Sequence, residues 1–90
     1  MKHQISEPEA VEIVKRAKQP RAWTFDREIF DALLKQRGAT GIRVYIGRNA
    51  KGDNTPVVVA TDAAGGDLMG IIAEEAVPCP PFCGDSALTL

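Results

Sequence analysis

Residues 41–61 read GIRVYIGRNAKGDNTPVVVAT. The first part of this segment alternates between apolar and other side chains, with the apolar ones at Ile42, Val44 and Ile46. Such alternation is typical of a strand that has one face in the core and the other in solvent. Residues 56–61 are almost entirely apolar and β-branched, which favours a strand buried on both faces. The two runs therefore predict a hairpin whose second strand is central.

A first helix is predicted to begin after Ser6. Ser6 and Glu9 have the spacing of a capping box, and Pro8 suits the first turn. The apolar residues that follow fall on one side of a helix, at Ala10, Ile13, Val14 and Ala17. Pro20 predicts that the helix stops by residue 19.

A second helix is predicted after residues 22–25, which suit a short strand. Asp26 is the expected N-cap, with Phe25 and Phe30 at the two positions of a hydrophobic staple. A broad apolar stripe follows, formed by Ile29, Phe30, Leu33 and Leu34. The helix is expected to end near Gln36, before a glycine.

Two polar, glycine-containing segments, 49–54 and 62–67, are predicted to be turns and not calcium loops, because they lack the EF-hand spacing. Residues 68–73 suit either a strand or a short helix. From residue 77 onward, three prolines exclude a helix and favour an extended arm or a knotted turn.

These elements predict an α+β fold in which two helices pack on one face of a small three- or four-stranded sheet. Ninety residues suffice for one domain, and the composition, 44% hydrophobic and 26% charged, is that of a globular protein. We expect a single domain over residues 1–76 and a Pro- and Cys-rich arm over 77–90.

Charge is divided unevenly along the chain. Residues 1–51 hold all eleven Lys and Arg and six of the twelve acids, whereas residues 52–90 hold the other six acids and neither Lys nor Arg. Such a division can mark a nucleic-acid face or an acidic tail, and it also arises when two halves of one small domain fold against each other. A basic cluster near Trp23 could contact nucleic acid, through Lys15, Arg16, Lys18 and Arg21. Because the whole chain has a net charge of −1, we do not expect a nucleic-acid partner.

The chain shows neither a secretory signal nor an apolar run long enough to span a membrane. We therefore expect a cytoplasmic protein without a membrane partner. In a reducing compartment, Cys79 and Cys83 are expected to be thiols.

Four segments resemble a group of short bacterial proteins to which no activity is assigned. They are Phe25-Asp26, Gly41-Ile42-Arg43-Val44-Tyr45, Val59-Ala60-Thr61-Asp62 with its glycine-rich turn, and the tail from Pro78 to Cys83. The resemblance covers most of the chain from the second helix onward. It implies a domain of this kind and transfers no catalytic residue.

The segment Cys79-Pro80-Pro81-Phe82-Cys83 allows two geometries. A polyproline II conformation would separate the two Cα atoms by roughly 12 Å, beyond the span of about 4.4–6.8 Å that a disulfide allows. A type VI turn with a cis bond before Pro81 would instead bring the sulfurs together, in a disulfide or on one metal.

A structural zinc site needs about four ligands, more than one copy of this chain supplies. The chain offers Cys79, Cys83 and the distant His3, so that a dimer pooling four thiols would be required. His3 also has no nucleophile placed beside it, so no catalytic residue is predicted and the protein is not expected to be an enzyme.

The valine-rich strand presents apolar side chains to both faces of the sheet, so something should cover the second face. Either the protein's own tail or another subunit could do so. We therefore expect a non-enzymatic domain that binds a protein partner or forms a homo-oligomer, with the contact residues Val77, Pro78, Pro80, Pro81 and Phe82. The alternative is a thiol protein that uses Cys79 and Cys83 for metal binding or redox chemistry.

Overall fold

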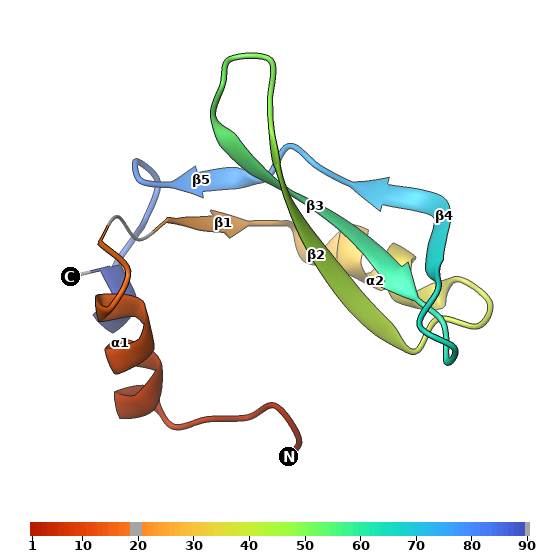
Figure 1. The fold of residues 1–90 in the computed structure, drawn as a ribbon, viewed down its shortest axis with the longest axis horizontal. Coiled ribbons are helices and arrows are strands. Elements are labelled where there is room, and N and C mark those ends of the chain that lie inside the picture. The colour runs from red at the N-terminus through yellow and green to blue at the C-terminus, as the bar shows by residue number, and fades with distance from the viewer. Residues whose placement is uncertain (19–20, 90) are drawn as a thin grey trace. The chain divides into compact units, whose positions relative to one another are not determined.

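The computed structural model describes residues 1–18 and 21–89. In chain order, the elements of this part are α1 Glu7–Lys15, β1 Ala22–Thr24, α2 Arg27–Lys35, β2 Gly41–Arg48, β3 Asn54–Thr61, β4 Asp67–Ala73, β5 Val77–Cys79 and the 3₁₀ helix η1 Ala87–Thr89. One sheet has the strand order β2-β3-β4, and a second sheet pairs β1 with β5 (Figure 1). The predicted α+β class is confirmed.

The chain forms two compact units. One contains Trp23–Val77, and the other combines Met1–Ala22 with Pro78–Leu90. The single domain over 1–76 and the arm over 77–90 stay predictions.

The three-stranded sheet is antiparallel and has β3 at its centre, as predicted. β2 and β3 pair in one unbroken register from Gly41 opposite Thr61 to Arg48 opposite Asn54. Pairing between β3 and β4 contains a register shift between Val58 and Ala60. Residues 68–73, which the sequence left open, belong to strand β4.

Both segments that were predicted to be turns close a hairpin, and the two turns are of the same kind. Asn49 Oδ1 accepts hydrogen bonds from the amides two and four residues later, both at 3.0 Å. Asp62 Oδ1 does the same, at 3.0 Å and 2.8 Å. In each turn the fourth residue, Gly52 or Gly65, has a φ of +87°, a left-handed conformation that glycine adopts without penalty.

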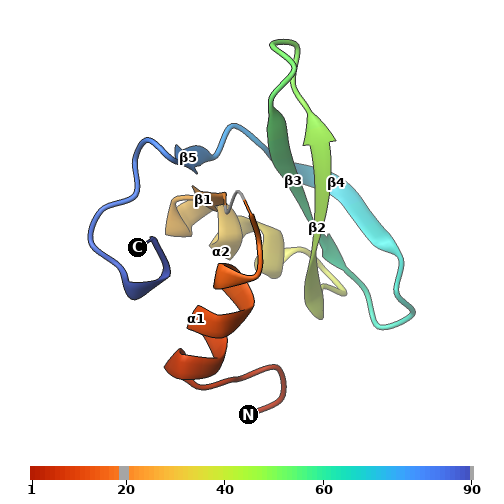
Figure 2. The same ribbon diagram turned by 60° about the vertical axis from the view of Figure 1, so that its left-hand side comes forward.

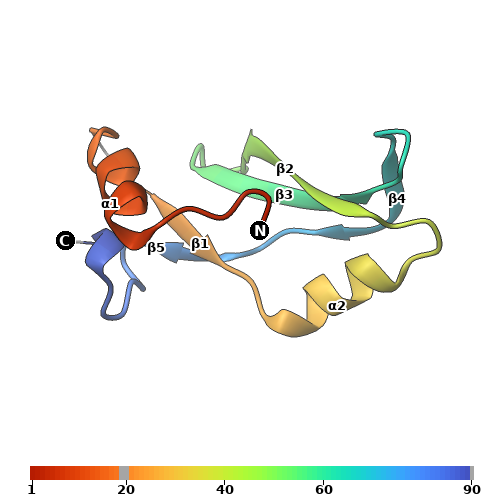
Figure 3. The same ribbon diagram turned by 90° about the horizontal axis from the view of Figure 1, so that it is seen from below.

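The core of the Trp23–Val77 unit lies between α2 and one face of the sheet (Figure 3). Its buried members are Leu33, Val58, Ala60 and Ala73. The Phe25 and Phe30 rings lie 5.6 Å apart, which agrees with the predicted staple. Asp26 occupies the N-cap position of α2, but its side chain makes no capping hydrogen bond.

Helix α2 is too short to cover the whole β2–β3 hairpin. Nine helical residues extend about 14 Å, whereas an eight-residue strand extends roughly 26 Å. The hairpin extends beyond the helix-covered part of the sheet (Figure 2). The expectation that Ile42, Val44 and Ile46 all face the core is therefore corrected, because Ile42 packs on the core whereas Val44 and Ile46 are 55% and 59% exposed.

On the opposite face of the sheet, polar side chains of the two outer strands meet across β3. Arg43 on β2 contacts Asp67 on β4 at 2.6 Å, and the Tyr45 hydroxyl donates to the same carboxylate. Arg43 stands opposite Val59 in the ladder, so its stem must pass over β3 to reach Asp67. Val59 is only 1% exposed. Val59 is therefore covered by side chains of the sheet itself. The expected cover by the tail or by a second subunit is not needed at this residue.

In the other unit, α1 begins with the predicted capping box. The Glu9 amide donates to Ser6 Oγ at 3.3 Å, and the Ser6 amide donates to Glu9 Oε1 at 3.4 Å. The helix ends at Lys15, and Pro20, the predicted stop, lies outside the described residues. None of the nine residues of α1 is buried, and η1 lies against this helix. Among the described residues, no helix has the length and apolar character needed to cross a membrane.

Candidate functional site

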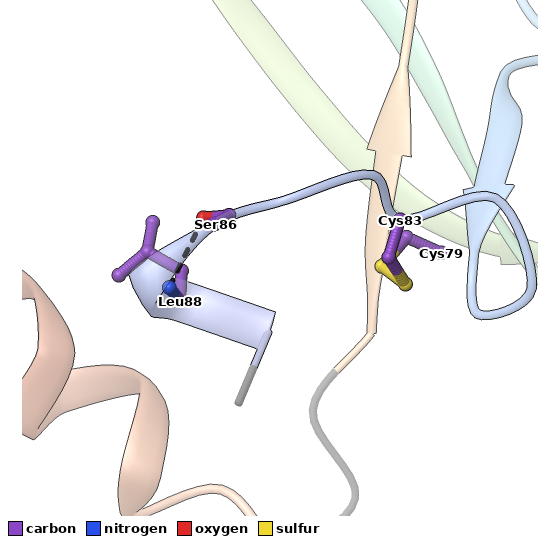
Figure 4. Close-up of a disulfide and its surroundings, with 4 residues drawn as sticks. All are labelled: Cys79, Cys83, Ser86 and Leu88. Atoms are coloured by element: carbon purple, nitrogen blue, oxygen red, sulfur yellow. Dashed lines mark hydrogen bonds between the residues drawn. A yellow bond between two sulfur atoms is a disulfide. The ribbon is translucent and has the colours of Figure 1, made fainter.

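The segment after β5 forms a small loop closed by a disulfide between Cys79 and Cys83 (Figure 4). The Cα atoms of the two cysteines lie 4.7 Å apart. The Phe82 amide donates to the Pro78 carbonyl oxygen at 3.0 Å, which supports the reversal of the chain. The peptide bonds before Pro80 and Pro81 are both cis.

This geometry decides between the two alternatives that the sequence left open, and it corrects one expectation. The chain takes the reversed turn with a cis bond before Pro81, and not the polyproline II conformation with its separation of roughly 12 Å. The cysteines are not the free thiols that we expected, since their sulfurs are bonded to each other. The thiol expectation rested on the assumed compartment, whereas the turn brings the two residues within disulfide reach.

The loop turns its apolar tip toward solvent. Phe82 is 67% exposed, and Pro80 and Pro81 are exposed beside it, whereas Cys79 is only 8% exposed. The loop thus unites most of the predicted contact residues, and Val77 falls in the other compact unit. Phe82, one of the predicted contact residues, is thus largely open to solvent.

A pocket of about 310 Å³ lies beside the disulfide. It is lined by Val14, Arg21, Ala22, Cys79, Pro80, Cys83 and Leu88. The Leu88 amide donates to Ser86 Oγ at 3.0 Å, a local bond that stabilises the start of η1 (Figure 4). The loop therefore has one packed side, where Cys79 lies, and one exposed side, where Phe82 lies.

Residues 1–18 and 21–89 contain no cluster of three or more His, Cys, Asp or Glu side chains that could hold a metal ion. His3 lies in the exposed segment before α1, with a φ of +69°. A zinc site at Cys79 and Cys83 would require reduction of the disulfide, because zinc binds thiolates. Zinc binding stays a prediction for the reduced protein.

Sequence reasoning missed two features of the sheet. The first is the cluster of Arg43, Tyr45 and Asp67, in which the hydrogen bonds of Tyr45 and then of Asp67 raise the pKa of the Arg43 guanidinium. The second is the exposed apolar pair Val44 and Ile46. Comparing the expected helix length with the strand length could have revealed the second, whereas the first depends on the pairing of β4.

Comparison with protein-family models, curated proteins and solved structures found no match. The functional conclusion therefore rests on the geometry of the site.

Proposed function

We propose that this chain is a non-enzymatic protein-binding domain whose contact element is the loop closed by Cys79 and Cys83. The observation that supports it is the 67% exposure of Phe82 on a loop whose two ends are covalently joined. An exposed aromatic ring costs free energy in water, and aromatic side chains are frequent anchors at protein interfaces.

The closed loop favours binding for a second reason. A flexible segment loses conformational entropy when a partner orders it, whereas a loop with joined ends has already lost much of that freedom. Pro80 and Pro81 restrict it further, because each ring fixes φ. The expected partner is a protein with an apolar pocket that receives one aromatic ring.

Crosslinking from residue 82 tests this function. A photoreactive phenylalanine analogue replaces Phe82 in the full chain, which is then irradiated in an extract of its own cells. The expected result is one discrete adduct that excess unlabelled protein suppresses and excess Phe82→Ala protein does not. The analogue at Met69, which is 62% exposed on β4, is the matched control. No adduct at 82, or equal competition by Phe82→Ala, would contradict the proposal.

A second candidate function is a reversible redox switch at the same loop, which the pairing of Cys79 with Cys83 favours over metal binding. In this reaction a cellular dithiol is oxidised to its disulfide and its two electrons and two protons reduce the loop to two thiols. Titration with dithiothreitol, followed by alkylation and mass measurement, determines the reduction potential. A potential above about −300 mV would support the switch, and a lower one would mark a structural disulfide.

A further inference from the structure

We propose that β2 is the interface of a homodimer, in which the β2 strands of two copies pair antiparallel about a two-fold axis. The inference concerns a surface different from the Cys79–Cys83 loop and does not rest on the function proposed for that loop.

The two edges of the three-stranded sheet differ in regularity. At the β4 edge, the pairing with β3 shifts register between Val58 and Ala60. The Gln36 side chain also lies so close to Gly70 that a Cβ there would be 3.1 Å from its Oε1. Bulges of this kind protect an edge from pairing with another chain.

The β2 edge has no bulge among the described residues. Its eight residues pair with β3 without a shift, and they include neither proline nor lysine. The charge of Arg43 is directed inward across the sheet, to Asp67 and to the Gly65 carbonyl oxygen at 3.1 Å. Charged side chains that point outward usually guard an exposed edge, and Arg43 does not. The other charged residue of β2, the exposed Arg48, stands at the last position of the strand and outside its centre.

The backbone register identifies which groups face the open edge. The Asn49 amide donates to the Asp53 carbonyl oxygen at 2.8 Å, so these two residues form a hydrogen-bonded pair. The register of β2 and β3 continues from this pair without a shift. In an antiparallel pair, every second residue bonds to the neighbouring strand, so the odd-numbered residues of β2 bond to β3. The N–H and C=O groups of Ile42, Val44 and Ile46 therefore point toward the open side.

The exposed side chains lie beside these backbone groups. Val44 and Ile46 are 55% and 59% exposed on the face that carries α2, and Tyr45 is 46% exposed on the other face. A strand added at this edge would cover apolar surface as well as satisfy backbone groups.

β2 is complementary to itself, which is why we assign the edge to a second copy of this chain. When Tyr45 lies opposite Tyr45 of the second copy, Val44 lies opposite Ile46 twice, and Arg43 lies opposite Gly47. No like charges then face each other, and the four exposed aliphatic side chains form one cluster. One contact also closes the unguarded edge of both copies and leaves the bulged β4 edges outside. Because two eight-residue strands bury little area, we expect a dissociation constant in the micromolar range.

Sedimentation equilibrium of the full chain tests the dimer. We expect a concentration-dependent dimer that Val44→Lys and Ile46→Lys convert to a folded monomer, with unchanged circular dichroism. Met69→Lys is the matched control, because Met69 is exposed on β4, and it should remain dimeric. A wild-type chain that stays monomeric at high micromolar concentration, or a dimer that only Met69→Lys dissociates, would overturn the proposal.

A cysteine crosslink tests the register. Directly opposed residues at the centre of the proposed pairing have Cα atoms about 4.5 Å apart, within the span of a disulfide. Tyr45→Cys should therefore form an intermolecular disulfide under mild oxidation, whereas Lys51→Cys in the turn should not. Crosslinking through Val44→Cys in place of Tyr45→Cys would contradict this register.

Discussion

At the scale of single residues, burial separates neighbours that the sequence treats alike. Leu33 and Leu34 are adjacent in α2 and both belong to the predicted apolar stripe, yet Leu33 is fully buried and Leu34 is 50% exposed. Leu33 points into the cluster formed with Val58, Ala60 and Ala73, so its side chain is surrounded by the sheet.

Leu33→Ala should therefore lower the free energy of unfolding by about 2–5 kcal/mol, because it removes buried apolar surface and leaves a cavity. Leu34→Ala is the control and should cost less than about 1 kcal/mol. Urea denaturation of the two variants measures both values. Equal losses would show that the helix face is assigned wrongly.

Asp67 accepts hydrogen bonds from both Arg43 and Tyr45, so its charge holds together the polar cover over Val59. Asp67→Asn should lower the melting temperature, but by less than Leu33→Ala, because the pair with Arg43 is partly exposed. The difference from wild type should shrink in high salt, which screens the ion pair. Asp85→Asn, which changes the same charge in the tail, should leave the melting temperature nearly unchanged. Salt-independent destabilisation by Asp67→Asn would contradict an electrostatic role.

At the scale of elements, the two hairpin turns depend on one glycine each. A Cβ on Gly65 would meet no atom within 4 Å, so the cost of Gly65→Ala comes from its φ of +87° and not from a clash. We expect a loss of about 1 kcal/mol for Gly65→Ala and a smaller loss for Gly65→Asn, since asparagine tolerates this conformation.

Gly47→Ala is the control for this prediction. Gly47 lies in β2, is not among the glycines with positive φ, and its nearest atom to an added Cβ is 3.8 Å away. Alanine should therefore be tolerated there. If chemical denaturation showed that Gly47→Ala costs as much as Gly65→Ala, the left-handed requirement at Gly65 would be refuted.

At the scale of the whole molecule, stability should differ strongly between the two compact units. β3 is central in its sheet and has Val58, Val59 and Ala60 buried, whereas α1 has no buried residue. Local opening costs least where few apolar contacts are broken. Amide hydrogen exchange should therefore be fastest in α1 and slowest in β3. Protection of α1 equal to that of β3 would contradict this expectation.

The sequence by itself determined the elements whose signals are local. The capping box at Ser6 and Glu9, the staple of Phe25 and Phe30, and the two turns involve residues close together in the chain, so the spacing of residue types was enough to predict them. Alternation also identified β2, and β-branched composition identified the central strand β3.

Only the tertiary structure decided which surfaces stay open. The exposure of Val44 and Ile46 follows from the length of α2 relative to the hairpin, and the cover over Val59 follows from the pairing of β4. Closure of the loop between Cys79 and Cys83 depended on a choice between two backbone geometries that the residues alone left open. These features arise from contacts between distant segments, and such contacts have no periodic signal in the chain because they depend on how the elements pack.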